Sequence, residues 1–218
     1  MGLTLVIGNK NYSSWSMRPW LMLKGAALAF DEVSIPLYTD ATDKQRIVDY
    51  APSGKVPILV DGGVTIWDSL AIIEYLADRF PEAGIWPADR AKRAHARSIS
   101  AEMHSGFQAL RNECGMNIHR PVRAKSLSAD AKDNIARVQE IWADCRTRNA
   151  ENGPFLFGRF SAADAMFAPV VHRFLTYAIE ASPSARAYMA TMTTFAPFKE
   201  WTDAALEETL LIDKFEHD

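Results

Sequence analysis

The sequence has few cysteines and no long apolar run. Only two of its 218 residues are cysteines, Cys114 and Cys145, whereas a disulfide framework or a structural zinc site needs more thiols. No window reaches the roughly eighteen uninterrupted apolar residues of a membrane span, and no basic segment precedes the apolar start MGLTLVIGNK. These absences predict a reduced, cytoplasmic protein without a membrane partner.

An excess of charge of one sign is also absent. The chain carries 24 Lys and Arg against 27 Asp and Glu, a net charge of −3, which gives no indication of a nucleic-acid partner. The five histidines are scattered, and His95, His104 and His119 share no tight face of a predicted helix, so no metal site is predicted. Apolar residues are plentiful: 48% of the chain is hydrophobic, which is enough for a sizeable core.

The first part of the chain alternates between strand and helix patterns. Two apolar runs on either side of Asp61-Gly62-Gly63 give a strong hairpin signal. The whole part is predicted to run strand, helix, strand, helix, strand, strand, helix, over residues 3–7, 16–28, 30–36, 40–52, the two halves of 56–67, and the stretch that follows Asp68-Ser69.

The rest of the chain is helical in character. Residues 81–89, PEAGIWPAD, contain two prolines and a glycine and are typical of a linker. Long helices are predicted over 90–116 and 128–150, and another from Ser161. Breaks at Pro183-Ser184 and then at Ala196-Pro197 divide the remainder into two shorter helices. The fold class is therefore α/β plus all-α, with domains 1–80 and 89–218 and a linker over 81–88.

Four short motifs carry the chemical information. Three serines and Arg18 stand between the first strand and the first helix, where they could cap the helix or bind a ligand. Val56-Pro57 opens a strand, as an ordinary trans proline or as a cis proline that frees the Val56 backbone for an extended ligand. Asp68-Ser69 opens a helix, as a cap or as an anion site. Ser161 and Asp164 have the spacing of a capping box, which is structural.

The order SSxSxR, GKVPIL, WDSLAIIEYL and FSAADAMFAP resembles the cytosolic glutathione transferase family, and most of all its zeta class, which includes maleylacetoacetate isomerase. The resemblance extends over nearly the whole chain. It implies a thioredoxin-like N-terminal domain, a helical-bundle C-terminal domain, a homodimer and glutathione as cosubstrate. A role in detoxification is the corresponding expectation.

The resemblance also implies the glutathione-binding residues. Val56-Pro57 matches the cis-proline element that pairs with the cysteinyl backbone, and Asp68-Ser69 matches the pair that holds the γ-glutamyl end. Lys55 falls near the glycyl carboxylate. Further residues expected to face glutathione are Trp15, Gln108 and Asn112, the last two being four apart on one helical face.

Trp15 is a departure from the zeta pattern, because zeta enzymes have a cysteine after the paired serines. A tryptophan cannot act as a thiol, so the isomerase assignment is weakened and thiol–disulfide chemistry at this loop is disfavoured. Tyr12 is a rival hydroxyl beside the serines.

The hydroxyls themselves predict the mechanism. A free thiol is mostly protonated at neutral pH, and a serine hydroxyl that donates to the sulfur would stabilise the reactive thiolate. The zeta-like spacing favours Ser13 over Ser14 as the catalytic partner, and the other serine is then expected to cap the helix or orient the loop. A pocket for a small hydrophobic electrophile is expected between the domains, lined by Tyr12, Met103, Phe107 and Arg111.

Three functions remain open at this point. The first is a transferase that adds glutathione to an electrophile, and the second is a glutathione-dependent cis–trans isomerase of the maleylacetoacetate type. The third is a glutathione-binding interaction module with little activity. The sequence does not identify the electrophile.

Overall fold

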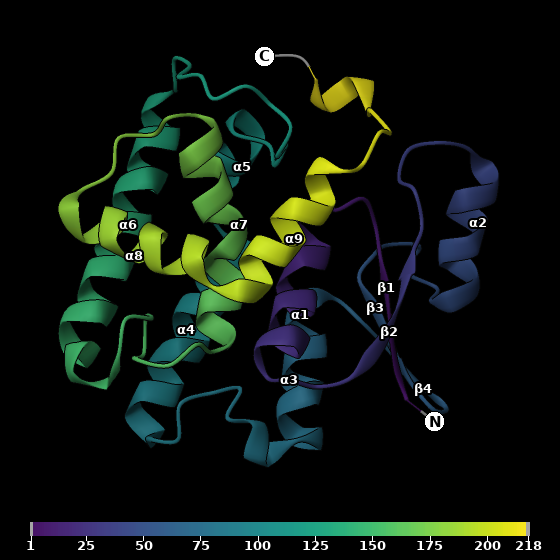
Figure 1. Cartoon of the computed structure of the whole chain (residues 1–218), viewed down its shortest axis with the longest axis horizontal. Coiled ribbons are helices and arrows are strands. Elements are labelled where there is room, and N and C mark those ends of the chain that lie inside the picture. Colours follow the sequence, from purple (N-terminus) through teal and green to yellow (C-terminus); the bar gives the residue numbers. More distant parts are fainter. Residues whose placement is uncertain (1, 217–218) are drawn as a thin grey trace.

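A computed structural model describes residues 2–216, which form a small sheet unit followed by a larger helical unit (Figure 1). The first unit contains the predicted order of strands and helices, with these bounds: β1 Leu3–Ile7, α1 Ser14–Gly25, β2 Phe30–Ser34, α2 Ala41–Tyr50, β3 Ile58–Asp61, β4 Val64–Trp67 and α3 Ser69–Arg79. The β3–β4 hairpin turns at Gly62, whose φ of 58° suits glycine.

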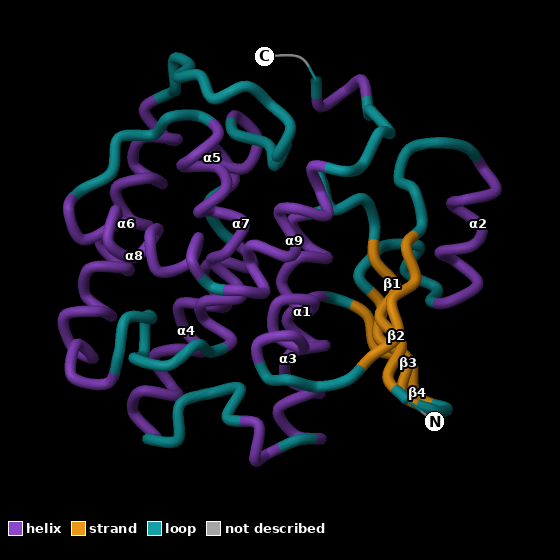
Figure 2. Tube along the Cα trace, in the orientation of Figure 1, coloured by secondary structure: helices purple, strands orange, loops and turns teal. Residues whose placement is uncertain are grey.

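The four strands lie in the order β2-β1-β3-β4, with β1 parallel to β2 and antiparallel to β3, and with β3 antiparallel to β4. Side chains alternate across this sheet. Leu5 and Ile7 pack in the main core with α1 and α3, whereas Val6 packs with Ile47 of α2. The sheet is therefore covered by α1 and α3 on one face and by α2 on the other, as Figure 2 shows.

The second unit is helical throughout. Its elements are α4 Arg90–Ser105, α5 Gln108–Glu113, α6 Ala129–Asn149, α7 Ala162–Thr176, α8 Pro183–Thr194 and α9 Ala196–Leu206, with short 3₁₀ turns η1 Pro81–Ala83, η2 Ala150–Asn152 and η3 Asp213–Phe215. Helix α7 is buried almost entirely and packs against both α1 and α4, so it joins the two units. Its capping box of Ser161 and Asp164 is confirmed.

The single long helix predicted over 90–116 is wrong. The chain leaves the helix at Gly106, where a Cβ atom would lie 2.8 Å from the Glu102 carbonyl oxygen. Phe107 then adopts a left-handed conformation with φ of 60°, and α5 starts in a new direction. The predicted strand over 30–36 likewise ends early, at Ser34.

No helix within residues 2–216 is long and apolar enough to span a membrane.

Candidate active site

A pocket of about 870 Å³ lies where the serine loop, the segment before β3 and helix α5 meet. Nine of the residues predicted from the sequence line it: Tyr12, Ser13, Ser14, Trp15, Lys55, Val56, Gln108, Arg111 and Asn112. They come from both units, so the pocket lies between them.

The serine loop is held by a chain of hydrogen bonds. Ser13 is the N-cap of α1, and its Oγ accepts from the Ser16 amide at 3.3 Å. The Ser13 and Ser16 hydroxyls lie 2.7 Å apart, and the Ser16 Oγ accepts from the Gly8 amide at 3.1 Å. The end of β1 is thereby tied to the first turn of α1.

Ser14 differs from its neighbour. It lines the same pocket, but its hydroxyl has no hydrogen-bond partner within residues 2–216. With Ser13 facing the sulfur, Ser14 was expected to cap the helix or orient the loop, but the structure gives the cap to Ser13. Capping uses a lone pair of the oxygen and leaves the hydroxyl proton available, so the cap does not remove Ser13 from the site.

Tyr12 donates its hydroxyl proton to Glu216 and accepts from the Ile212 amide at 3.2 Å. Burial and the Glu216 contact raise the pKa of Tyr12. Since its one proton is used by the C-terminal segment, Tyr12 is a poorer partner for a thiolate than the serines.

Val56-Pro57 is a cis peptide. Neither the amide nor the carbonyl of Val56 has a hydrogen-bond partner among the described residues. In the antiparallel β3–β4 pair Ile58 is opposite Trp67. Val56-Pro57 directly precedes Ile58, and Asp68-Ser69 directly follows Trp67. The pairing therefore brings the two predicted glutathione motifs side by side.

Asp68 and Ser69 lie at the start of α3, beside the cis Val56-Pro57 peptide, but they do not line the pocket. One oxygen of Asp68 accepts from the amides of Leu70 and Ala71 at 2.9 and 3.2 Å, and the other lies 3.2 Å from His104 Nε2. The hydroxyl of Ser69 is buried and has no partner within residues 2–216.

Met103 and Phe107 do not line the pocket. Both are buried in the main core, with 1% and 8% of their surface exposed. The physical reason is the break at Gly106, which turns the end of α4 into the core and leaves α5 to face the pocket. Pro57 is also buried and lies behind the lining.

Three arginines gather at the pocket. Arg111 and Arg173 line it, and each has a buried Nε without a hydrogen-bond partner among the described residues. Arg18 is buried near the pocket, and its Nε donates to the Met166 carbonyl of α7 at 3.1 Å, so it contacts the helical unit. Burial and the charge of Arg111 lower the pKa of Arg173 to about 10.

Trp15 organises this cluster. The guanidinium carbons of Arg18 and Arg111 lie 4.2 and 4.6 Å from the centre of its ring, and the His104 ring meets it edge-on at 5.3 Å. Arg111 also donates to the carbonyls of Met103 and His104 at the end of α4. The Trp15 ring thus contacts two cationic side chains.

The C-terminal segment approaches the loop into α2 (Figure 1). Its Phe215 lines the pocket. Phe215 stacks on Tyr12 with ring centres 5.5 Å apart and meets Tyr38 edge-on at 5.6 Å. Lys214 Nζ lies 3.0 Å from the centre of the Tyr38 ring.

Arg173 and Phe215 were not predicted. Arg173 could have been suspected because it stands, with His172, in the otherwise apolar run AMFAPVVHRFL of α7, where an arginine needs a reason to be buried. No sequence signal identifies Phe215, because its role depends on how the chain end folds back.

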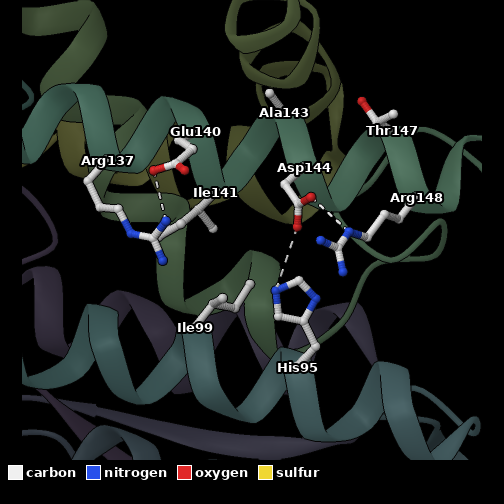
Figure 3. A pocket seen from close by; sticks show the side chains of 9 residues that line it. All are labelled: His95, Ile99, Arg137, Glu140, Ile141, Ala143, Asp144, Thr147 and Arg148. Atoms are coloured by element: carbon white, nitrogen blue, oxygen red, sulfur yellow. Dashed lines mark hydrogen bonds and ion pairs between the residues drawn. The ribbon is translucent and has the colours of Figure 1, made fainter.

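A second hollow, of about 490 Å³, lies between α4 and α6 (Figure 3). Its charges pair with one another: Arg148 with Asp144 at 2.7 Å, and Arg137 with Glu140 at 2.9 Å. His95, Asp144 and Cys145 are grouped here within 4.8 Å. Burial raises the pKa of the Cys145 thiol to about 12, which disfavours the thiolate that a metal would bind.

Two protein-family descriptions match the chain: the glutathione S-transferase N-terminal domain over residues 12–79 and the glutathione S-transferase C-terminal domain over residues 117–208. The chain belongs to the glutathione S-transferase family. The matched stretches fall inside the predicted domains 1–80 and 89–218, whose boundaries stay a prediction.

Curated relatives carry zeta-class names, as the resemblance implied. A probable maleylacetoacetate isomerase of Caenorhabditis elegans is 41% identical over 99 residues, which is 45% of this chain and 45% of that protein. The maleylacetoacetate isomerase of Rattus norvegicus is 30% identical over 178 residues, 78% of this chain and 77% of the rat protein. Several of the matches span less than half the length of the relative.

The fold is shared with solved structures. A glutathione transferase homolog from Burkholderia with bound glutathione superposes with a TM-score of 0.73 at 22% identity, over 94% of this chain and 99% of that one.

Proposed function

We propose that this protein is a glutathione transferase that binds glutathione along the cis-proline turn and activates its thiol with the Ser13 hydroxyl. The observation that carries the proposal is the convergence of two serine hydroxyls at the start of α1, the unpaired backbone of Val56 and the unpartnered hydroxyl of Ser69. Each of these polar groups has no protein partner or can form a further hydrogen bond. They lie at the serine loop and at the adjoining cis-proline turn and α3 start.

The cysteinyl part of glutathione pairs with the Val56 amide and carbonyl as a short added strand. The γ-glutamyl carboxylate accepts from the Ser69 hydroxyl and from the Ser69 amide, since the Leu70 and Ala71 amides are already taken by Asp68. Asp68 faces the γ-glutamyl ammonium. Lys55 lies on the side of the glycyl carboxylate, and Gln108 and Asn112 approach from α5. The tripeptide then places its sulfur at the serine loop.

The Ser13 hydroxyl donates to the sulfur, and the positive end of the α1 dipole adds to the effect. A hydrogen bond to a charged group contributes about 1.5–3 kcal/mol. Because one pKa unit corresponds to about 1.4 kcal/mol, this bond is sufficient to lower the thiol pKa by one to two units. Ser13 keeps its proton throughout, since no base lies against it.

We propose further that the electrophile carries a carboxylate. A buried cation without a counter-ion is costly, and the Arg173 side chain has neither an ion pair nor a hydrogen bond within residues 2–216. A ligand carboxylate between Arg111 and Arg173 would supply both. Met116, Tyr12 and Phe215 provide apolar walls for the rest of a small molecule.

An isomerase is the second candidate. Addition of glutathione to a conjugated, carboxylate-bearing alkene, rotation and elimination would use the same groups, and relatives named maleylacetoacetate isomerase favour it. Trp15 in place of the zeta cysteine is the feature against it. The binding-only module remains the third candidate and is disfavoured because the serines are retained.

The test is a panel of electrophiles with and without carboxylates, maleylacetone included, followed with glutathione. Net consumption of glutathione supports conjugation. Turnover that leaves the glutathione concentration constant supports isomerisation. Binding by calorimetry without turnover of any panel member would favour the interaction module and contradict the enzyme proposal.

We also propose a homodimer in the cytoplasm. The proposal rests on family membership and on two buried, free cysteines that suit a reducing compartment. Light scattering that gives a monomer mass at micromolar concentration would contradict the dimer.

A further inference from the structure

Ser16 is the member of the serine loop that cannot touch a ligand. It is fully buried and absent from the pocket lining, yet its hydroxyl lies 2.7 Å from the Ser13 hydroxyl that faces the pocket. This contact lets the buried Ser16 hydroxyl influence the orientation of the Ser13 proton.

The protons of this pair can be assigned by counting. The Ser16 Oγ already accepts from the Gly8 amide. If it also accepted from Ser13, its own proton would have no acceptor among the described residues, and an unmet buried donor is costly. If Ser16 donates to Ser13 instead, the proton of the fully buried Ser16 has an acceptor. The one proton of the pair without a protein acceptor is then that of Ser13, which lines the pocket and can point into it.

We propose that Ser16 is a positioning residue for the thiolate: a relay runs from the Gly8 amide through the Ser16 hydroxyl to the Ser13 hydroxyl and from there to the sulfur. The inference rests on the proposed function. In this assignment Ser13 accepts from the Ser16 hydroxyl, whose oxygen lies 2.7 Å away, in addition to the Ser16 amide at 3.3 Å. Hydrogen bonds in series polarise one another, so Ser13 becomes a stronger donor to the sulfur.

The relay has a fixed origin. Gly8 directly follows β1, and a side chain there would collide with Leu37, so the amide that starts the relay is held by close packing. The Ser13 amide donates to the Asn9 carbonyl at 2.8 Å, which fixes the other end of the loop. Ser14 lines the same pocket but lies outside this relay, so Ser14→Ala tests the alternative partner of the sulfur.

The experiment measures the pKa of the bound glutathione thiol from its ultraviolet thiolate absorbance in Ser13→Ala, Ser14→Ala, Ser16→Ala and the double variant Ser13→Ala/Ser16→Ala. We expect thiolate at neutral pH to fall about tenfold in Ser13→Ala and about two- to fourfold in Ser16→Ala, as the loss of cooperative strengthening predicts. If Ser16 acts through Ser13, the double variant matches Ser13→Ala alone.

Two further variants separate this role from a structural one. Ser16→Thr keeps the hydroxyl and is expected to restore the thiol pKa. Ser16→Cys keeps the volume with a weak donor and is expected to behave like Ser16→Ala, and it serves as the test if Ser16→Ala does not fold. Stability of each variant is measured in parallel, because a purely structural serine would change stability and leave the thiol pKa alone.

The outcomes are distinguishable. A shift in Ser13→Ala with none in Ser16→Ala or Ser16→Cys, or additive effects in the double variant, overturns the relay and leaves the proposed function intact. An unchanged thiol pKa in Ser13→Ala overturns the proposed hydroxyl mechanism itself. A shift in Ser14→Ala alone moves the catalytic role to Ser14 and overturns the relay.

Discussion

The pocket at the serine loop and the second hollow, which forms a groove between α4 and α6, both contain charged side chains. These charges are arranged differently in the two places. In the groove each named charge has a neighbour of opposite sign, as the dashed contacts in Figure 3 show. In the pocket Arg111 and Arg173 face the cavity without a carboxylate partner among the described residues. Paired charges at a surface contribute little, whereas unpaired buried cations attract an anion.

The comparison is tested most strongly by Arg173→Gln. Loss of one hydrogen bond to a charged group, about 1.5–3 kcal/mol, is expected to lower kcat/KM for a carboxylate-bearing electrophile about tenfold to hundredfold. Stability is not expected to fall, since the removed cation has no partner to lose. Steady-state kinetics with paired charged and uncharged electrophiles measures the effect.

Arg137→Gln in the groove is the matched control, because it removes an arginine whose partners are surface carboxylates. It is expected to leave kcat/KM unchanged for both electrophiles. Equal losses for charged and uncharged electrophiles in Arg173→Gln would contradict a carboxylate site.

Ser69→Ala tests the glutathione end of the pocket. The buried hydroxyl has no protein partner, and its loss is expected to weaken glutathione binding by about 1–2 kcal/mol, or roughly fivefold to thirtyfold. Calorimetry measures the affinity. Ser100→Ala is the control, because that hydroxyl is equally buried and unpartnered but lies in the interior of α4 and not at a helix start beside the cis proline. A similar loss in both variants would remove Ser69 from the site.

Ser13→Ala tests whether one serine holds two roles. Because Ser13 caps α1, we expect unfolding free energy to fall by about 1 kcal/mol, in addition to the rise in thiol pKa. Ser14→Ala is expected to change neither by a measurable amount. Denaturant unfolding compares the two, and an equal loss of stability in Ser14→Ala would contradict the assignment of the cap.

Asp144→Asn is expected to have the smallest effect. Its partner Arg148 is 67% exposed, and exposed pairs of this kind contribute about 0.3–0.5 kcal/mol, less at high salt. Thermal unfolding at low and high salt measures it. A loss of stability well above this range would contradict the view that the pairs in the groove are ordinary surface pairs. A loss of glutathione turnover would show that the groove takes part in function.

Much of the fold was predictable because its signals are local. The hairpin at Asp61-Gly62-Gly63 and the cap at Ser161 depend on residues within a few positions of one another. The break at Gly106 was missed because the residues on both sides continue a helical pattern, and only the packing of α4 into the core shows that the chain must turn there.

The candidate site divides in the same way. The serine loop, Val56-Pro57 and Asp68-Ser69 were found from short motifs, and the β3–β4 register explains why the last two are neighbours. Met103 was misplaced because an apolar residue on a helix near a pocket has the same local pattern whether it faces the cavity or the core.

The sequence by itself determined the family, the order of the elements and the residues that offer hydroxyls and free backbone groups, because these are properties of short segments. Only the tertiary structure decided that Ser13 is the cap, that Ser16 lies behind it and that Arg173 faces the pocket unpaired. The physical reason is that hydrogen-bond satisfaction and burial depend on every neighbour of a group. For Arg173 those neighbours include Arg111 of α5 and Arg18 of α1, which lie far away along the chain.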